Sequence, residues 1–177
     1  LLSKGSSKNV TIRTSWLFSP FGKNFVKTIT RLAKEKSDLK VVEDQWGRPT
    51  YGIDLARTIL RLMSINKIYA FPILHYASQG VCSWKEFAET IVCELESDTI
   101  IKGIQTSVYP TLAKRPKYSI LNTQRIEKEL GIAIPKWKES LNALIMMVQG
   151  HLVLNIVNTT HQMILMLMGL HKNMLFL

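Results

Sequence analysis

The sequence has few cysteines, and none of them in a pattern that builds a site. Its 177 residues include two, Cys82 and Cys93, which are too few for a disulfide framework and too far apart for a C-x-x-C pair. We therefore expect reduced thiols and a cytoplasmic protein. The start of the chain lacks the basic segment, apolar core and cleavage site of a secretory signal. Because it begins with Leu1 rather than methionine, we expect a fragment of a longer protein.

Acidic residues are also scarce. The chain has 13 Asp and Glu residues against 23 Lys and Arg, a formal net charge of +10. Such an excess favours a nucleic-acid partner, but no zinc-ligand spacing, recognition-helix pattern or aromatic-basic stripe accompanies it. We expect no nucleic-acid partner. Lysines on solvated helix faces explain most of the charge, and a positive cleft for an anionic substrate is the alternative.

A clean membrane-spanning run is missing as well. A span needs about 20 mostly apolar residues, and polar residues between Asn155 and Gln162 interrupt the Met- and Leu-rich end of the chain too early. Its histidines lie ten residues apart, which is not a metal-ligand spacing. We interpret residues 146–177 as an extraneous tail, such as a frameshifted or read-through sequence, beyond a domain formed by residues 1–145. An added helix that packs on the protein or on a membrane surface is the alternative.

What the sequence does contain is a strand, a loop and a helix start within residues 11–25. The β-branched run from Val10 to Thr14 predicts a buried strand, and Pro20 and Gly22 end its pairing. Asn24 is a good N-cap for the amphipathic run that follows.

The loop after this strand carries Trp16. Ligands of open α/β sheets bind where strands end, so Trp16 is a candidate to stack on a sugar or to close a pocket. The alternative is that Trp16 and Phe18 simply anchor the loop in the core.

Hydrophobic periodicity predicts the remaining elements. We expect strands at 39–42, 72–78 and 99–104, helices at 54–63, 84–95, 123–130 and 136–147, and irregular loops at 43–51 and 109–119. Ser83 and Glu86 form a capping box at one helix start, and Gly131 ends another helix. We interpret Asp54 as favouring the dipole of its helix.

Arginines in the two loops are candidate anion ligands. Arg48 precedes Pro49 and is therefore extended, and its bidentate guanidinium suits a diphosphate. The alternative is a surface ion pair between Arg48 and Asp44. The second loop carries Lys114 and Arg115, and such a charge run is by itself typical of a solvated basic loop.

Five stretches in order carry a family resemblance. They are RTSWLFSPFGKNFVKT, DQWGRPTYGIDLA, GVCSWKEFAETI, YPTLAKRPKYSILNTQRIEKELGI and PKWKESL, between residues 13 and 141. Together they resemble the dTDP-4-dehydrorhamnose reductases, which are extended short-chain dehydrogenase/reductases. The resemblance implies an α/β fold, namely the C-terminal part of a doubly wound, Rossmann-type NAD(P)-binding sheet with a small mixed α/β substrate lobe.

The same resemblance implies a reaction and its ligands. The family reduces the 4-keto group of dTDP-4-dehydro-L-rhamnose to give dTDP-L-rhamnose, with NADPH or NADH as hydride donor. Mg²⁺ is a further candidate cofactor, a dTDP-sugar is the expected partner, and a homodimer of the intact parent stays open.

The resemblance also assigns site residues. Trp16 would pack against the deoxysugar. Arg115, and to a lesser degree Lys114, would lie in the substrate lobe near the diphosphate and are binding candidates for that reason. Asn24 would reach a phosphate if it does more than cap its helix. Thr14 and Ser15 would border the nicotinamide. We expect no metal ligands in this chain.

Two features of the family are absent from the sequence. No tyrosine is followed four residues later by lysine, the pair that such reductases use as general acid, and no glycine-rich phosphate loop is present. We therefore expect no catalytic residue here and no activity of the chain alone. Unpaired strand edges would also make it poorly soluble. A non-catalytic, nucleotide-binding regulatory subunit of the same family is the alternative.

Overall fold

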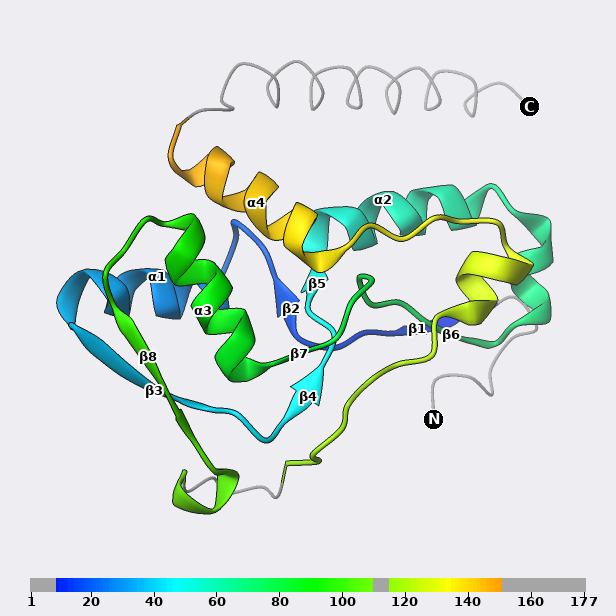
Figure 1. Cartoon of the computed structure of the whole chain (residues 1–177). Coiled ribbons are helices and arrows are strands. Elements are labelled where there is room, and N and C mark those ends of the chain that lie inside the picture. The colour runs from blue at the N-terminus through cyan, green and yellow to red at the C-terminus, as the bar shows by residue number, and fades with distance from the viewer. Residues whose placement is uncertain (1–8, 110–114, 151–177) are drawn as a thin grey trace. The chain divides into compact units, whose positions relative to one another are not determined.

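The computed structural model describes residues 9–109 and 115–150 (Figure 1). The chain divides into two compact units, residues 1–142 and 143–177. The strands and the first three helices all belong to the first unit, and helix α4, Trp137–Val148, crosses the boundary. Lys114 and residues 151–177 lie outside the described residues, so the interpretation of residues 146–177 as a separate tail stays a prediction.

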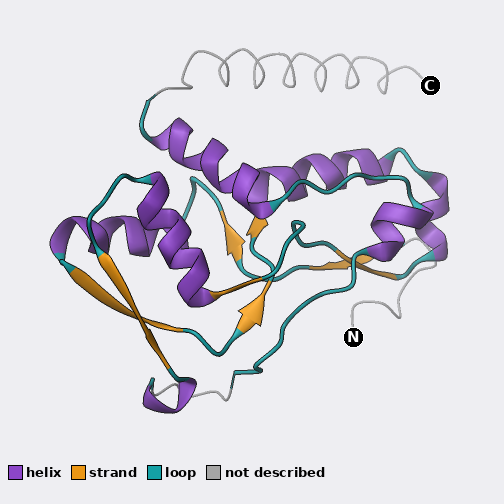
Figure 2. Cartoon of the chain, in the orientation of Figure 1, coloured by secondary structure: helices purple, strands orange, loops and turns teal. Residues whose placement is uncertain are grey.

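The strands are short and pair two by two. Three pairs are parallel: β1 (Thr11–Arg13) with β6 (Ile73–His75), β2 (Leu17–Phe18) with β5 (Thr50–Tyr51), and β3 (Asp38–Val42) with β8 (Ile100–Ile104). β4 (Trp46–Gly47) runs antiparallel to β7 (Cys82–Ser83). Parallel strands joined through helices confirm the predicted α/β class (Figure 2).

Helices connect these pairs. They are α1 (Phe25–Glu35), α2 (Gly52–Met63) and α3 (Trp84–Glu94), with 3₁₀ turns at Asn66–Ala70 and Thr106–Val108 and a π-helical turn at Arg125–Glu129. α1 and α3 lie side by side, and both contact the strands of the β3–β8 pair (Figure 1).

The predicted helix ends are confirmed. The Asn24 side chain accepts a hydrogen bond from the Lys27 N–H (3.1 Å). In the capping box the Ser83 N–H donates to Glu86 (3.0 Å) and the Glu86 N–H donates to Ser83 (3.1 Å). Gly131 adopts φ +66° after the Arg125–Glu129 turn, where a residue with a Cβ would be strained.

Four predicted elements were wrong in extent. The strands predicted over 10–14 and 72–78 keep only Thr11–Arg13 and Ile73–His75. The loop predicted over 43–51 contains β4 and β5, whose two-residue pairings leave no periodic signal. The helix predicted over 123–130 is reduced to the π-helical turn, in which the N–H of Leu130 donates to the carbonyl of Arg125, five residues back.

One hydrophobic core lies between the β1–β6 pair, α2 and the π-helical turn. Its buried members are Leu62, Ile68, Leu74, Tyr76, Ile126, Leu130, Ile132 and Ile134. Val10, Ile12 and Leu55 pack against this core from its border. The predicted inward residues of the last helix, Trp137, Leu141, Leu144 and Ile145, are all buried.

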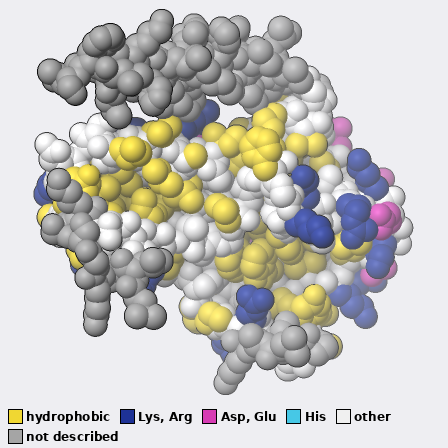
Figure 3. All heavy atoms as spheres, turned by 180° about the vertical axis from the view of Figure 1, so that it is seen from behind, with side chains coloured by type: hydrophobic (Ala, Val, Ile, Leu, Met, Phe, Trp, Pro, Cys, Tyr) yellow, Lys and Arg dark blue, Asp and Glu magenta, His cyan; other side chains and the backbone are white. Residues whose placement is uncertain are grey.

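The exposed side of α2 carries three large apolar residues beside Arg57 and Arg61. Ile59, Leu60 and Met63 are open to solvent, and Figure 3 shows hydrophobic side chains gathered in broad patches on one side of the molecule. Among the described residues β1 pairs with β6 alone, so its other edge has no partner. Both features are those expected of a poorly soluble chain. No helix within residues 9–109 and 115–150 is long and apolar enough to cross a membrane.

Two neighbouring residues of α2 test the assignment of its two faces. Leu62 is 1% exposed in the core and Met63 is 74% exposed. Leu62→Ala should lower the free energy of unfolding by about 3 kcal/mol, because a buried cavity replaces the side chain. Met63→Ala should change it by less than about 0.5 kcal/mol. Urea denaturation of both variants measures this, and equal losses would contradict the assignment.

The two thiols should react differently. Cys82 is buried, and burial raises its pKa to about 12, whereas Cys93 is exposed. Because the thiolate is the reactive form, a disulfide reagent near neutral pH should label one thiol in the native chain and two in urea. Cys93→Ser should abolish the native labelling, and rapid native labelling of this variant would contradict the burial of Cys82.

Candidate functional site

Trp16 has an unusual backbone. It follows β1 and adopts φ +47°, a left-handed conformation in which a bulky side chain is an outlier. Its carbonyl accepts a hydrogen bond from the N–H of Thr50 (3.1 Å), next to the pairing of β2 with β5. Residues held in such conformations cost about 1–3 kcal/mol each and cluster at functional sites.

Two residues enclose the indole of Trp16. Trp84 stacks on it, with ring centroids 3.6 Å apart and an angle of 12° between the planes. Gly47 lies so close that an added Cβ would sit 2.7 Å from Cζ2 and 2.8 Å from Nε1 of Trp16. With Trp84 stacked 3.6 Å from Trp16, no backbone fits between the two rings. Gly47 therefore lies against the other face of the Trp16 indole. We call Gly47, Trp16 and Trp84 the tryptophan clamp.

The β4–β7 pair assembles the clamp. Its register sets Gly47 opposite Cys82, and Trp84 follows β7 directly as the first residue of α3. Trp84 is supported in turn by Phe25, whose ring centroid is 4.6 Å away. The packing alternative for Phe18 is correct, since it is buried between Tyr51 and Phe87.

Arg48 follows the clamp and is 7% exposed. Its Nε donates to the carbonyl of Ser78 (2.8 Å), and its Nη1 donates to the carbonyl of Leu121 (3.1 Å) and the hydroxyl of Thr123 (3.2 Å). Nη2 is buried without a partner. Burial lowers the pKa of Arg48, and the nearby Glu127 carboxylate opposes that change.

The alternative of an Arg48–Asp44 surface pair was wrong. Asp44 accepts instead from the hydroxyl (2.6 Å) and the N–H (2.8 Å) of Thr106, and these bonds hold the pKa of Asp44 below its ordinary value. The acidic group near Arg48 is Glu127, which accepts hydrogen bonds from Thr123 (2.5 Å) and from Gln79.

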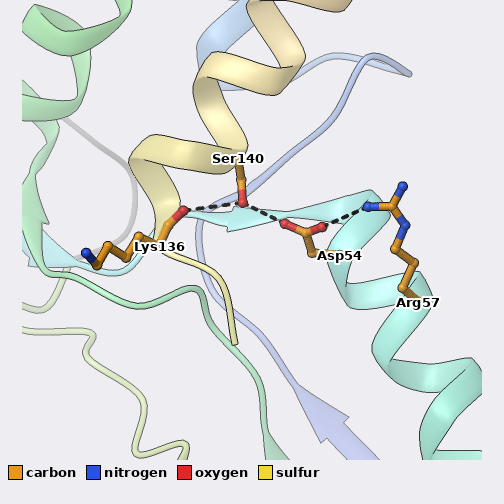
Figure 4. Close-up of polar contacts among 4 residues, drawn as sticks. All are labelled: Asp54, Arg57, Lys136 and Ser140. Atoms are coloured by element: carbon orange, nitrogen blue, oxygen red, sulfur yellow. Dashed lines mark hydrogen bonds and ion pairs between the residues drawn. The ribbon is translucent and has the colours of Figure 1, made fainter. Parts of the chain in front are cut away.

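Asp54 does more than favour a helix dipole. It lies in the first turn of α2 and is buried. Its Oδ2 accepts from the hydroxyl of Ser140 (2.6 Å), and its Oδ1 lies 3.4 Å from Nη1 of Arg57 (Figure 4). The contact joins α2 to the start of α4 within the first unit.

The remaining predicted site residues are Thr14, Ser15, Asn24 and Arg115, and of these only Ser15 bonds to another predicted site residue. Ser15 donates from its hydroxyl to the carbonyl of Arg48 (3.0 Å), which joins it to Arg48. Thr14 and Arg115 are exposed. Both ends of the Asn24 amide are used, because its Nδ2 donates to the carbonyl of Ser19 (2.8 Å) while its oxygen caps α1.

The structure thus brings Ser15, Trp16 and Arg48 together. Sequence reasoning missed Gly47, Trp84, Ser140 and Glu127. Only Gly47 gave a usable signal in the sequence, because it is a glycine next to the candidate binding residue Arg48. Its contact with Trp16, 31 positions away, could not be predicted from that signal. The roles predicted for these residues in ligand binding stay predictions.

Two buried tyrosines, Tyr51 and Tyr76, have shifted pKa values. Burial raises the pKa values of Tyr51 and Tyr76, which makes both phenols weaker acids. In the part of the chain that the structure describes, no three His, Cys, Asp or Glu side chains cluster as metal ligands. We derive no step through Mg²⁺.

Replacing Arg48 should destabilise the fold. Arg48→Met leaves the carbonyls of Ser78 and Leu121 without donors and Glu127 without its cation, and should lower the free energy of unfolding by about 3 kcal/mol. Arg115→Met, at an exposed position, is the matched control and should change it by less than about 0.5 kcal/mol. Chemical denaturation measures both, and a neutral Arg48→Met would contradict the structural role.

Comparison with known proteins places this chain in a family. Residues 2–149 match the family described as RmlD substrate binding domain. A dTDP-4-dehydrorhamnose reductase of Aggregatibacter actinomycetemcomitans is 38% identical over 150 residues, which is 80% of this chain and 51% of the relative. The chain therefore spans about half the length of the curated relatives it matches.

Solved structures agree. A dTDP-4-dehydrorhamnose reductase from Clostridium acetobutylicum superposes with a TM-score of 0.72 at 39% identity, over 78% of this chain and 48% of that one. The Bacillus anthracis reductase in complex with NADP gives 0.71 at 36% identity, over 76% and 47%. These likenesses confirm the predicted relation to one part of a Rossmann-type enzyme. The chain belongs to the RmlD substrate binding domain family.

Proposed function

We propose that this chain is the substrate-binding half of an NAD(P)H-dependent dTDP-4-dehydrorhamnose reductase. The parent enzyme reduces the 4-keto group of dTDP-4-dehydro-L-rhamnose to give dTDP-L-rhamnose. The observation that carries the proposal is the family match over residues 2–149, together with relatives of that name at 38–39% identity.

In this proposal the chain binds and orients the sugar nucleotide. Trp16 contacts the sugar, and Arg48 and Arg115 act on the diphosphate. For Arg48 the group is Nη2, which is buried and has no partner among the described residues, so the diphosphate must reach it from inside the site. Asn24 lies at the start of α1, where a phosphate would meet the positive end of the helix dipole. The net charge of +10 favours the approach of an anionic ligand.

The cofactor needs groups that this chain does not have. Thr14 and Ser15 would border the nicotinamide, but the sequence has neither a glycine-rich loop nor a tyrosine four residues before a lysine. NADPH or NADH would supply the hydride in the intact parent, and the general acid would come from the part of the relatives that this chain does not span. A homodimer of that parent and a cytoplasmic location, which two free thiols favour, complete the proposal.

Calorimetric titration of dTDP-L-rhamnose into the chain tests this function. We expect binding that weakens with salt, and a loss of at least about tenfold in affinity for Arg115→Ala, because a charged hydrogen bond to phosphate is removed. Trp16→Ala should also weaken binding. Arg61→Ala, an exposed arginine on α2, is the control and should bind like the wild type.

Circular dichroism and thermal melting must first show that each variant is folded. A folded wild-type chain that binds neither dTDP-L-rhamnose nor dTDP would contradict the proposal. Equal losses for Arg115→Ala and Arg61→Ala would assign the binding to general charge rather than to this site.

A further inference from the structure

Both faces of the Trp16 indole are covered by the protein itself. Trp84 is stacked on one face at 3.6 Å and nearly parallel, and the backbone of Gly47 lies against the other. A ligand that stacks on Trp16 would first have to displace Trp84 or move the β4 strand. Trp16 is partly exposed, and because Trp84 and Gly47 lie against its two faces, we infer that a ligand reaches the rim of its ring.

We propose that Trp16 meets its ligand through the edge of the indole, and that Trp84 and Gly47 are positioning residues that set this orientation. The inference rests on the proposed function, because it specifies how the same site contacts the sugar nucleotide. Trp84 and Gly47 act on the ligand only through Trp16.

The chemistry of the ring edge defines the ligand atom. An indole carries negative charge density on its faces and positive charge density at its rim, and Nε1–H at that rim is a hydrogen-bond donor only. No described residue accepts a hydrogen bond from Nε1. The edge therefore selects an oxygen acceptor, such as a sugar hydroxyl or a phosphate oxygen, whereas a ring face would select the apolar C–H face of a sugar.

The backbone supports the same orientation. The left-handed φ of Trp16 turns its side chain between β4 and α3, and the bond from Thr50 N–H to the Trp16 carbonyl holds it there. The capping box of Ser83 and Glu86 fixes the first turn of α3 and with it Trp84. Trp16 is thus held by Trp84, by Gly47 and by the hydrogen bond from Thr50. A strained residue held in this way is preorganised for its ligand and does not adapt to it.

The clamp can be observed directly, without a ligand. Two stacked indoles couple their electronic transitions and give an exciton couplet in circular dichroism. We expect the couplet in the wild type, its loss in Trp84→Leu and Trp16→Phe, and its retention in Trp46→Phe, which removes a neighbouring tryptophan outside the stack. Gly47→Ala should weaken it, because the new Cβ collides with the indole. A couplet that survives Trp84→Leu would overturn the clamp.

Titration with dTDP-L-rhamnose then distinguishes a contact at the edge of the Trp16 indole from a contact at its face. If the edge makes the contact, the couplet persists at saturation, and Trp16→Phe, which loses Nε1–H, binds about three- to tenfold more weakly. Trp84→Leu should weaken binding by a similar factor, and Trp84→Phe, which restores a stacking ring, should recover most of it.

Loss of the couplet on saturation would overturn the edge contact, because the ligand would have replaced Trp84 on the indole face. Unchanged affinity in Trp84→Leu would overturn the positioning role. In a last outcome, a folded wild type shows the couplet and still binds no dTDP-sugar. That result would contradict both the proposed function and the edge contact, whereas the tryptophan clamp would be confirmed.

Discussion

A buried arginine connects parts of this chain that the sequence keeps far apart. Arg48 donates to Ser78 at the end of the β6 segment and to Leu121 and Thr123, more than 70 positions away. Burying a guanidinium is costly unless charge and hydrogen bonds compensate it, and here Glu127 and three oxygen acceptors do so. β1, β2, β4 and β5 are only two or three residues long. Pairing between such short strands cannot by itself hold the segments around Arg48, Ser78 and Thr123 together.

The candidate site follows from this arrangement. Arg48 continues directly from β4, so the contacts that hold Arg48 also hold Gly47 against Trp16, and the pairing of β4 with β7 brings Trp84 to the other face. Ser15, one residue before Trp16, bonds to the Arg48 carbonyl. The structural role of Arg48 therefore overlaps with the ligand-binding role that we propose for it. Most of its donors serve the fold, and Nη2 alone is without a protein partner.

Much of the local structure could be predicted from the sequence, because its causes are local. The Asn24 cap, the Ser83–Glu86 capping box and the turn at Gly131 each depend on residues within four positions of one another. The partners of Arg48, the stacking of Trp84 on Trp16 and the Asp54–Ser140 contact depend on tertiary folding across 30 to 90 positions, which leaves no periodic signal. The family resemblance supplied the α/β architecture and the candidate residues, but not the geometry among them.

We propose that this chain supplies the substrate side of a reductase whose cofactor side lies in the other half of its relatives. The most direct test combines the chain with the amino-terminal half of the Aggregatibacter actinomycetemcomitans reductase and follows NADPH oxidation with dTDP-4-dehydro-L-rhamnose. The account predicts turnover when both halves are present and none from either half alone. Turnover by this chain alone, or a stable complex of the two halves without turnover, would contradict it.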